Sequence, residues 1–268
     1  MVGGAFRMYP CHIPGVEAVA ASTDHRFPRH FHEQYGFGLI ERGAQRSASG
    51  RGMVEAGPGD LITVNPGEIH DGTPIGVAGR SWRMLYFDPA IIAEASRDLN
   101  EGEGGDFEFT RPVINDLRVA APFHNLFAAA TQAGDTAVSL QFDELLLLVL
   151  ADIDHERPTK HNGRPPPIFR AKAKIDDAPS APVTLAELAR LCGLSRFQVL
   201  RGFVKATGLT PHAYLMQSRL GLARRLIARQ HSLADAAAES GFADQSHMTR
   251  LFIRNFGVSP GVYAAAVA

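Results

Sequence analysis

One supersecondary pattern occurs twice in the C-terminal part of the chain. Its first half places leucine, alanine and glycine at four-residue steps, beginning at Leu185 and again at Leu233, a shift of 48 positions. Its second half, Phe-x4-Gly-x-(Thr or Ser)-Pro-x2-Tyr, begins at Phe203 and again at Phe252, a shift of 49 positions. Self-similarity over such a length indicates a small structural module used twice. The chain must therefore fold two copies of that module.

Each copy predicts a helix-turn-helix. Small residues at four-residue steps let one helix pack closely on a neighbour, and the glycine that follows, Gly193 or Gly241, permits the sharp turn into a second helix. Thr184 and Glu187 form a capping-box pattern that starts the first helix. The second helix of each copy must bury one stripe and expose the other. The helical period turns these residues outward: Arg196, Phe197, Leu200 and Arg201 in the first copy, and Gln245, Ser246, Thr249 and Arg250 in the second, with His247 at the edge.

The outward residues have the chemistry that reads base edges in DNA. Arginine can bind guanine with two hydrogen bonds, glutamine can bind adenine in the same way, and an apolar side chain can contact the thymine methyl. The charge distribution agrees, because residues 168–268 carry 13 Lys and Arg against 6 Asp and Glu, whereas the whole chain has a net charge of −1. The alternative is two ordinary helical hairpins with solvated arginines and with Phe197 and Leu200 in the core.

Taken together, residues 168–268 resemble the DNA-binding domain of AraC/XylS-type transcription regulators. The resemblance rests on six segments: Leu185–Arg196, Arg201–Phe203, Gly208–Tyr214, Arg219–Ala223, Gly241–Phe252 and Gly257–Tyr263. It implies seven helices, with a long helix from about Pro211 to Ala228 that sets the two recognition helices in successive major grooves of double-stranded DNA. By this resemblance we assign DNA contact to Arg196, Phe197, Leu200, Arg201, Gln245, Ser246, His247 and Arg250.

The chain divides before this region. Residues 156–167, ERPTKHNGRPPP, have the composition of an exposed linker. Earlier, residues 21–90 contain short apolar runs separated by Gly, Pro and Asn turns, a spacing that indicates an antiparallel sandwich or barrel. From about 112 to 155 the period becomes helical. We therefore expect an α+β protein, with an effector-binding and dimerisation domain at 1–155, a linker at 156–167 and an all-α domain at 168–268.

The helix predicted at 138–153 is apolar almost all round, so it needs cover on more than one side. One interpretation is burial within its own domain. The other is a seam between two copies of the chain, in which the segment from Leu140 to Ile153 carries the contact of a homodimer.

The strand-rich region resembles the two-motif pattern of cupin barrels. His30 and His32 lie in the first motif, and His70 follows the Pro-Gly turn of the second. Cupins often bind a metal ion through such histidines and a glutamate, and imidazoles suit several divalent transition metals. Here the glutamate position falls at or next to Gly36, and Glu33 would leave on the opposite strand face. We therefore favour a metal-free ligand site, with metal binding and purely structural histidines as the alternatives.

The same arrangement resembles the sensory domain of the AraC family, in which a cupin-like β-barrel holds a small effector and flanking helices make the dimer. The function that this implies is sequence-specific DNA binding by a transcription regulator, an activator controlled by a small molecule. Candidate effector contacts combine polar donors with one ring: His30, His32, Arg46, His70 and Trp82. No pattern identifies the effector.

Several classes of site and location are not indicated. The sequence has neither a signal pattern nor an apolar run long enough to span a bilayer, so we expect a cytoplasmic protein with no membrane partner. Two cysteines, Cys11 and Cys192, are too few for a disulfide framework or a cysteine-built zinc site. No serine-histidine-acid arrangement, P-loop or dinucleotide fingerprint is apparent, so we expect no catalytic residue and no cofactor.

Two other function classes stay open at this point. One is a metal-dependent cupin enzyme, catalysing oxygenation or isomerisation, with an appended helical domain that binds nucleic acid or a partner. The other is a partner-binding module whose C-terminal domain contacts RNA polymerase instead of bases. Metal content distinguishes the first, and an interaction that ignores both salt and DNA sequence distinguishes the second.

Overall fold

The structure is a computed structural model that describes residues 5–99, 107–132, 136–153 and 167–267. The chain forms two compact units that divide near residue 160. The expected linker, 156–167, lies outside the described residues apart from Pro167, which directly precedes the first helix of the second unit.

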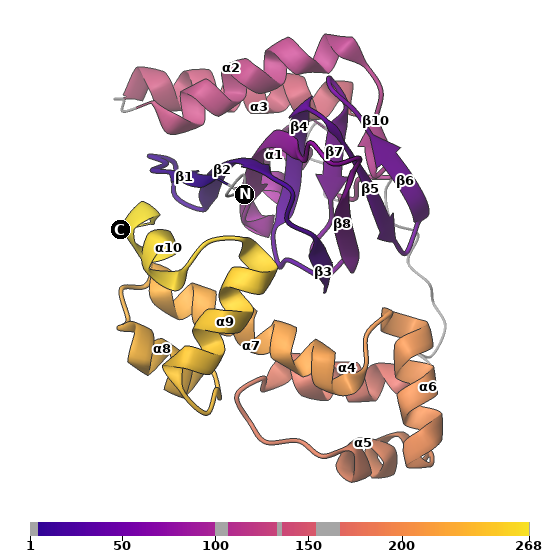
Figure 1. The fold of residues 1–268 in the computed structure, drawn as a ribbon. Helices are drawn as coiled ribbons and strands as arrows, with labels where there is room; N and C mark the ends of the chain where they lie inside the picture. Colours follow the sequence, from indigo (N-terminus) through magenta and orange to yellow (C-terminus); the bar gives the residue numbers. More distant parts are fainter. Residues whose placement is uncertain (1–4, 100–106, 133–135, 154–166, 268) are drawn as a thin grey trace. The chain divides into compact units, whose positions relative to one another are not determined.

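The N-terminal unit is built on two antiparallel sheets (Figure 1). The strands of the six-stranded sheet are, in spatial order, β1 (Ala5–Tyr9), β2 (Val16–Thr23), β9 (Arg80–Phe87), β4 (Tyr35–Arg42), β7 (Leu61–Val64) and β10 (Val113–Ile114). The strands of the four-stranded sheet are β3 (Phe27–His30), β8 (His70–Ile75), β5 (Ala44–Ser49) and β6 (Gly52–Ala56).

The two faces of the six-stranded sheet pack into different cores. Because side chains alternate along a strand, Leu85 and Phe87 of β9 lie in a large core with the helices, whereas Trp82 and Met84 lie in a smaller core to which β6 also contributes, through Ala56. Burying one phenylalanine side chain such as Phe87 contributes about 1.5–3 kcal/mol relative to leaving it exposed. Of the candidate effector residues, Trp82 lies in this small core.

Of the two predicted arrangements, an antiparallel sandwich or barrel, the sheets form the sandwich. Among the described residues no ladder of hydrogen bonds joins the six-stranded to the four-stranded sheet, so the architecture is an open sandwich of two facing sheets. The α+β class and the flanking helices are confirmed. Apolar runs within residues 21–90 form β4, β7 and β9, and glycines with positive φ, Gly43, Gly59 and Gly67, stand in turns between the runs.

Three helices and a short 3-10 turn complete this unit: α1 (Pro89–Leu99), η1 (Leu117–Val119), α2 (Ala120–Thr131) and α3 (Thr136–Asp152). Helices α2 and α3 lie side by side across one face of the six-stranded sheet (Figure 1). Helix α3 buries Phe142, Leu146 and Leu150 in the large core, whereas Leu140 and Leu148 are each 61% exposed. One part of the helix surface is therefore buried within its own domain, and another part is exposed and free for a contact between two copies of the chain.

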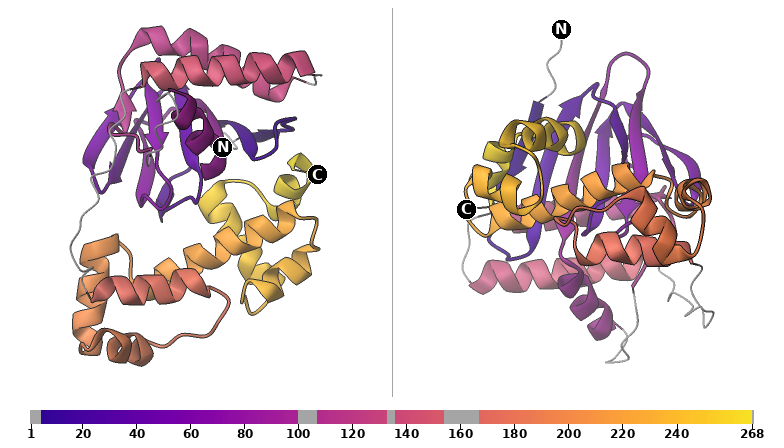
Figure 2. Two further views of the ribbon diagram at one scale, coloured as in Figure 1. Left: turned by 180° about the vertical axis from the view of Figure 1, so that it is seen from behind. Right: turned by 90° about the horizontal axis from the view of Figure 1, so that it is seen from below.

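The C-terminal unit is all helical among the residues described. Its helices are α4 (Ile168–Asp177), α5 (Leu185–Cys192), α6 (Arg196–Thr207), α7 (Pro211–Ala228), α8 (Leu233–Glu239), α9 (Gln245–Phe256) and α10 (Pro260–Ala266). Helix α7 runs between the group α8–α10 at one end and the group α4–α6 at the other, as both views show (Figures 1 and 2). The predicted bounds of α4 and α7 are confirmed. None of the described helices is long and apolar enough to cross a membrane.

Candidate DNA interface and histidine cluster

Helix α6 is the second helix of the first helix-turn-helix, and its ends are fixed locally. Ser195 caps its N-terminus in a reciprocal capping box with Gln198, and Gly208, with φ of 77°, ends it. Val199 and Phe203 are fully buried, which turns the predicted set outward. Arg196, Phe197 and Arg201 are exposed and Leu200 is half-buried, and the guanidinium of Arg201 lies 5.6 Å from the Phe197 ring centroid.

Helix α9 occupies the same place in the second copy. Asp244 caps it by accepting a hydrogen bond from the His247 amide at 2.7 Å, and Gly257, with φ of 75°, ends it. Met248 and Phe252 are fully buried. Of the predicted DNA contacts here, Gln245, Ser246 and Arg250 are exposed and His247 is half-buried. The predicted contacts of each copy therefore share one outward face, rather than forming a core as the hairpin alternative required.

A set of partly buried polar contacts fixes the second copy to α7. Arg219, in the middle of α7, donates to the carbonyl oxygens of Pro179 at 3.0 Å and Gly241 at 2.5 Å. Gln217 donates to Asn255 at 2.8 Å, and the Asn255 amide donates to the Leu251 carbonyl at 2.7 Å. These residues orient α9 and the turn before it. Arg219 belongs to a family motif, but no local sequence pattern gave Asn255 or Gln217 this role.

The three predicted histidines meet between the two sheets of the N-terminal unit. His30 and His70 are directly opposed on β3 and β8, and their ring centroids are 4.4 Å apart. The ring of His32 lies 4.9 Å from that of His30 and 5.2 Å from that of His70. One ring nitrogen of each histidine lies within 4.8 Å of those of the other two. We call these three residues the histidine cluster.

Backbone carbonyls fix the tautomer of two cluster members. Nδ1 of His30 lies 2.7 Å from the Pro28 oxygen, and Nδ1 of His70 lies 2.9 Å from the Glu68 oxygen. Because a carbonyl oxygen can only accept, each Nδ1 carries the proton and each Nε2 keeps its lone pair. Burial, with the neighbouring His70 as a second cause, lowers the pKa of His30 to about 3, and burial also lowers the pKa of His70. Both rings are therefore neutral at pH 7.

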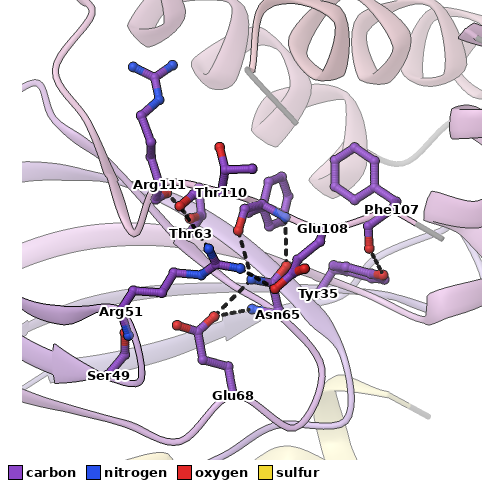
Figure 3. Close-up of polar contacts among 11 residues, drawn as sticks. Tyr35, Ser49, Arg51, Thr63, Asn65, Glu68, Phe107, Glu108, Thr110 and Arg111 are labelled. Atoms are coloured by element: carbon purple, nitrogen blue, oxygen red, sulfur yellow. Dashed lines mark hydrogen bonds and ion pairs between the residues drawn. The ribbon is translucent and has the colours of Figure 1, made fainter. Parts of the chain in front are cut away.

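The turn that carries His70 is held by the polar network of Figure 3. The Asn65 side-chain amide donates to the Glu68 carboxylate at 2.9 Å and to the Phe109 carbonyl at 3.0 Å. The Gly67 amide donates to the His32 carbonyl at 2.7 Å, which ties this turn to the segment after β3. Glu68 thus serves the cluster twice, through its carboxylate in the turn and through its carbonyl on His70.

Trp82 shares the space between the sheets with the cluster, and Phe27 links them. The Phe27 ring lies 6.0 Å from Trp82 and 5.9 Å from His30. Arg80, which the sequence reasoning did not select, is 3% exposed and lies 4.7 Å above the Trp82 ring. It donates to the Gln45 side chain at 2.8 Å, and burial lowers its pKa to about 10, so it stays charged at pH 7.

Arg46 does not join these residues. It stands opposite Glu55 on β5 and β6, and the two side chains form an exposed ion pair of 2.7 Å. Its neighbour Gln45 is the residue that points inward, to Arg80. The strand alternation therefore places Arg46 on the outer face.

The position expected to hold a cupin glutamate is glycine for a visible reason. A Cβ at Gly36 would lie 3.0 Å from two ring carbons of Tyr86 and 2.8 Å from the Met84 methyl. Tyr86, whose ring centroid is 5.0 Å from that of His32, fills the space that a longer side chain would need. Glu33 is exposed and lies in the segment between β3 and β4, not on a strand. The cluster is thus a set of three imidazoles without a carboxylate at Gly36.

Family models match both parts of this architecture. The model of the AraC-like ligand binding domain matches residues 13–150, which is more than half of the chain, and a helix-turn-helix domain model matches residues 188–266. The chain belongs to the AraC family. It is a transcription regulator with an N-terminal ligand-binding domain and a C-terminal helix-turn-helix DNA-binding domain.

Relatives from the AraC family cover nearly the whole chain. The HTH-type transcriptional regulator YbfI of Bacillus subtilis (strain 168) is 30% identical over 228 residues, which are 83% of this chain and 82% of YbfI. The HTH-type transcriptional activator RhaS of Klebsiella pneumoniae (strain 342) is 24% identical over 248 residues, 87% of this chain and 86% of RhaS. The crystal structure of ToxT from Vibrio cholerae O395 aligns with a TM-score of 0.54 at 12% identity, covering 100% of this chain and 99% of ToxT, and shows the shared fold.

Proposed function

We propose that this chain is a transcription activator that reads two adjacent major grooves of double-stranded DNA with α6 and α9. The observation that carries the proposal is a pair of capped helices, α6 and α9, at opposite ends of the single helix α7. Their exposed faces hold Arg201 and Arg250. Separate recognition helices about one DNA turn apart, roughly 34 Å, can each enter a major groove. The proposal assigns base contact to the predicted set: Arg196, Phe197, Leu200, Arg201, Gln245, Ser246, His247 and Arg250.

The proposed control is a small effector that binds between the two sheets. The candidate contacts are the histidine cluster and Trp82, and Arg80 replaces Arg46 as the charged donor because it faces the same space. The Nε2 lone pairs of His30 and His70 are suited to a donor group of a ligand, and the buried guanidinium of Arg80 is suited to an acceptor group. Such an effector can change DNA binding only if its affinity differs between two arrangements of the protein. An effector that leaves both operator affinity and DNA geometry unchanged would refute this control.

We propose that the active form is a homodimer in the cytoplasm, with α3 at the contact between protomers. The exposed Leu140 and Leu148 lie eight residues apart on this helix and so lie near one face. Activation would add a contact with RNA polymerase. No catalytic residue and no membrane partner are part of the proposal, since relatives of the chain are transcription regulators.

The test is a selection of fragments from a genomic DNA library by the purified full chain at moderate salt, read by sequencing. We expect recurrent asymmetric sites with two blocks about ten base pairs apart. The double variant Arg201→Ala/Arg250→Ala should lose this enrichment while keeping its thermal unfolding midpoint. The matched control, Arg97→Ala, removes an exposed arginine of α1 in the other unit and should select the same sites. Absence of enrichment for the folded wild type, even at low salt and with candidate effectors present, would contradict DNA reading.

A further inference from the structure

We propose that His30, His32 and His70 bind one divalent transition-metal ion. His30 of β3, His70 of β8 and His32 in the segment after β3 bring ring nitrogens within 4.8 Å of one another in a mostly buried place between the sheets. A protein-bound Zn²⁺ has nitrogen ligands at about 2.0–2.1 Å, which puts neighbouring ligand nitrogens about 3.3 Å apart in a tetrahedron. Side-chain rotations that move the nitrogens by about 1 Å would close the cluster around such an ion.

Hydrogen bonding prepares two of the three rings for a metal. Histidines that bind metals almost always donate their other ring N–H to a carboxylate, a carbonyl or water, which fixes the ring. His30 and His70 each place Nδ1 against a backbone carbonyl, of Pro28 and Glu68. Their Nε2 atoms therefore keep the lone pair that a metal ion needs. The carbonyl of Glu68 is itself held through the Asn65–Glu68 contact in the turn.

The donor set decides the class of ion. Three imidazole nitrogens suit Zn²⁺, Ni²⁺, Co²⁺, Fe²⁺ or Cu²⁺, whereas Mg²⁺ and Ca²⁺ prefer oxygen ligands. The tight packing of Gly36 against Tyr86 and Met84 leaves no carboxylate at the place where a fourth protein ligand is expected. Three protein ligands leave a coordination position for water or for an anionic ligand, and that open position is the chemistry the ion would supply.

The sequence favoured a metal-free site, whereas the structure brings the three imidazoles together. The metal-free site was favoured because the sequence lacks the expected glutamate. The sequence alone could not show how near the three imidazoles come to each other. The cross-strand pairing of His30 with His70 and the ring distances to His32 supply that information.

The experiment uses the full chain, stripped with a chelator, dialysed and then titrated separately with Zn²⁺, Ni²⁺ and Co²⁺. We expect one tightly bound ion per chain by calorimetry and by elemental analysis after gel filtration, and a visible d–d absorption band from bound Co²⁺. The thermal midpoint of the wild type should rise with metal concentration, because an ion that binds the folded state stabilises it. Mg²⁺ should produce neither effect.

Substitutions test whether the ion binds to the histidine cluster or to exposed histidines elsewhere in the chain. His32→Gln and His70→Gln should each weaken binding by at least about 100-fold, since losing an outer-shell partner alone costs about 10–100-fold. His212→Gln, on the exposed start of α7, should bind like the wild type. Circular dichroism of the metal-free variants checks that they fold. If the wild type binds no ion in a saturable way, or if folded His32→Gln and His70→Gln bind as the wild type does, the metal site is refuted, whatever the chain does with DNA.

Discussion

Arg219 is the residue on which the geometry of the DNA-binding unit most depends. From the middle of α7 it donates to carbonyls in two segments far apart in the sequence, Pro179 between α4 and α5 and Gly241 in the second helix-turn-helix. A Cβ at Gly241 would lie 2.8 Å from the Ser180 oxygen and 3.1 Å from the Arg219 guanidinium carbon. Glycine is therefore needed at that turn for space as well as for its φ of 85°.

We expect Arg219→Met to lower the free energy of unfolding by about 2–4 kcal/mol, because the carbonyl oxygens of Pro179 and Gly241 lose their charged donor. Urea unfolding followed by circular dichroism measures the change. The control Arg229→Met, at the exposed end of α7, should stay within about 0.5 kcal/mol of the wild type. Equal stability of the two variants would show that the contacts of Arg219 contribute nothing net.

Arg250 tests base reading at one residue. It is exposed on the second turn of α9, opposite the buried Met248 and Phe252. We expect Arg250→Ala to cost about 1–3 kcal/mol of operator affinity and to relax preference at one base position. Binding to a panel of single-base operator variants measures both. A uniform loss on all sequences would move Arg250 to the class of phosphate contacts.

Two glycines of the first helix-turn-helix illustrate how one residue type serves different needs in its elements. Gly202 lies inside α6, where a Cβ would meet the Ile168 side chain of α4 at an ordinary contact distance of 3.4 Å. Gly193 ends α5 with φ of 68°, and nothing lies within 4 Å of an added Cβ. The first position has the geometry of an ordinary helical residue, whereas the second has a conformation that L side chains rarely adopt.

We therefore expect opposite signs for the two alanine substitutions. Gly202→Ala should stabilise the unit by about 0.5–1 kcal/mol through helix propensity, and Gly193→Ala should destabilise it by about 1 kcal/mol through its positive φ. Thermal unfolding of both variants beside the wild type measures the difference. A destabilised Gly202→Ala would mean that α4 cannot yield to the added methyl group.

Helix α3 is the element on which the proposed dimer rests. We expect Leu148→Asp, at an exposed position, to leave the chain folded but to make it monomeric in sedimentation velocity. Leu147 is a poorer choice, because it is half-buried against the large core. Gln141→Asp introduces the same charge at an exposed position of the same helix and should remain dimeric if its neighbourhood lies outside the contact. A folded, dimeric Leu148→Asp would count against α3 as the seam.

The sequence predicted elements best where caps and periodicity coincide. Helix α7 begins at Pro211 behind the Thr210 cap, and its bounds could be stated in advance. By contrast, strands β5 and β6, such as AQRSAS at Ala44–Ser49, contain few large apolar residues and were not singled out. Helix α1 was also not predicted. For such segments tertiary pairing, more than local preference, decides the structure.

The same limit applies to the candidate site. The histidine cluster could be selected from motif spacing, but the choice of Arg46 over Arg80 depended on which strand face points inward. A shift of one residue reverses every side chain of a strand, and only the pairing register of β5 with β6 and β8 settles it. The role of Asn255 likewise depends on a contact between α7 and α9 that no local pattern contains.

At the scale of the whole DNA-binding unit, the distance between α6 and α9 decides which DNA sites can be read. Arg219 and the Gln217–Asn255 contact fix the second copy to α7, and Phe203 of α6 packs on Tyr214 of α7 with ring centroids 5.4 Å apart. If α6 and α9 read adjacent grooves as proposed, they therefore require one spacing of the two DNA blocks. We expect insertion of about five base pairs, half a helical turn, between the two blocks to weaken binding by at least about 100-fold, since even one mismatched base pair costs about 1–3 kcal/mol. Gel-shift titrations with inserts of five and of ten base pairs measure this, and unchanged affinity with the shorter insert would contradict simultaneous reading.

In the N-terminal unit, the two faces of strand β9 contact different parts of the protein. Tyr86 contacts the ring of His32 on one face, with centroids 5.0 Å apart, and the next residue, Phe87, contacts Phe142 of α3 on the other, at 6.5 Å. The residue that contacts the histidine cluster and the residue that contacts α3, the helix proposed to join two protomers, are thus adjacent in the chain. A ligand that turns the Tyr86 ring therefore acts next to Phe87, the residue that contacts α3.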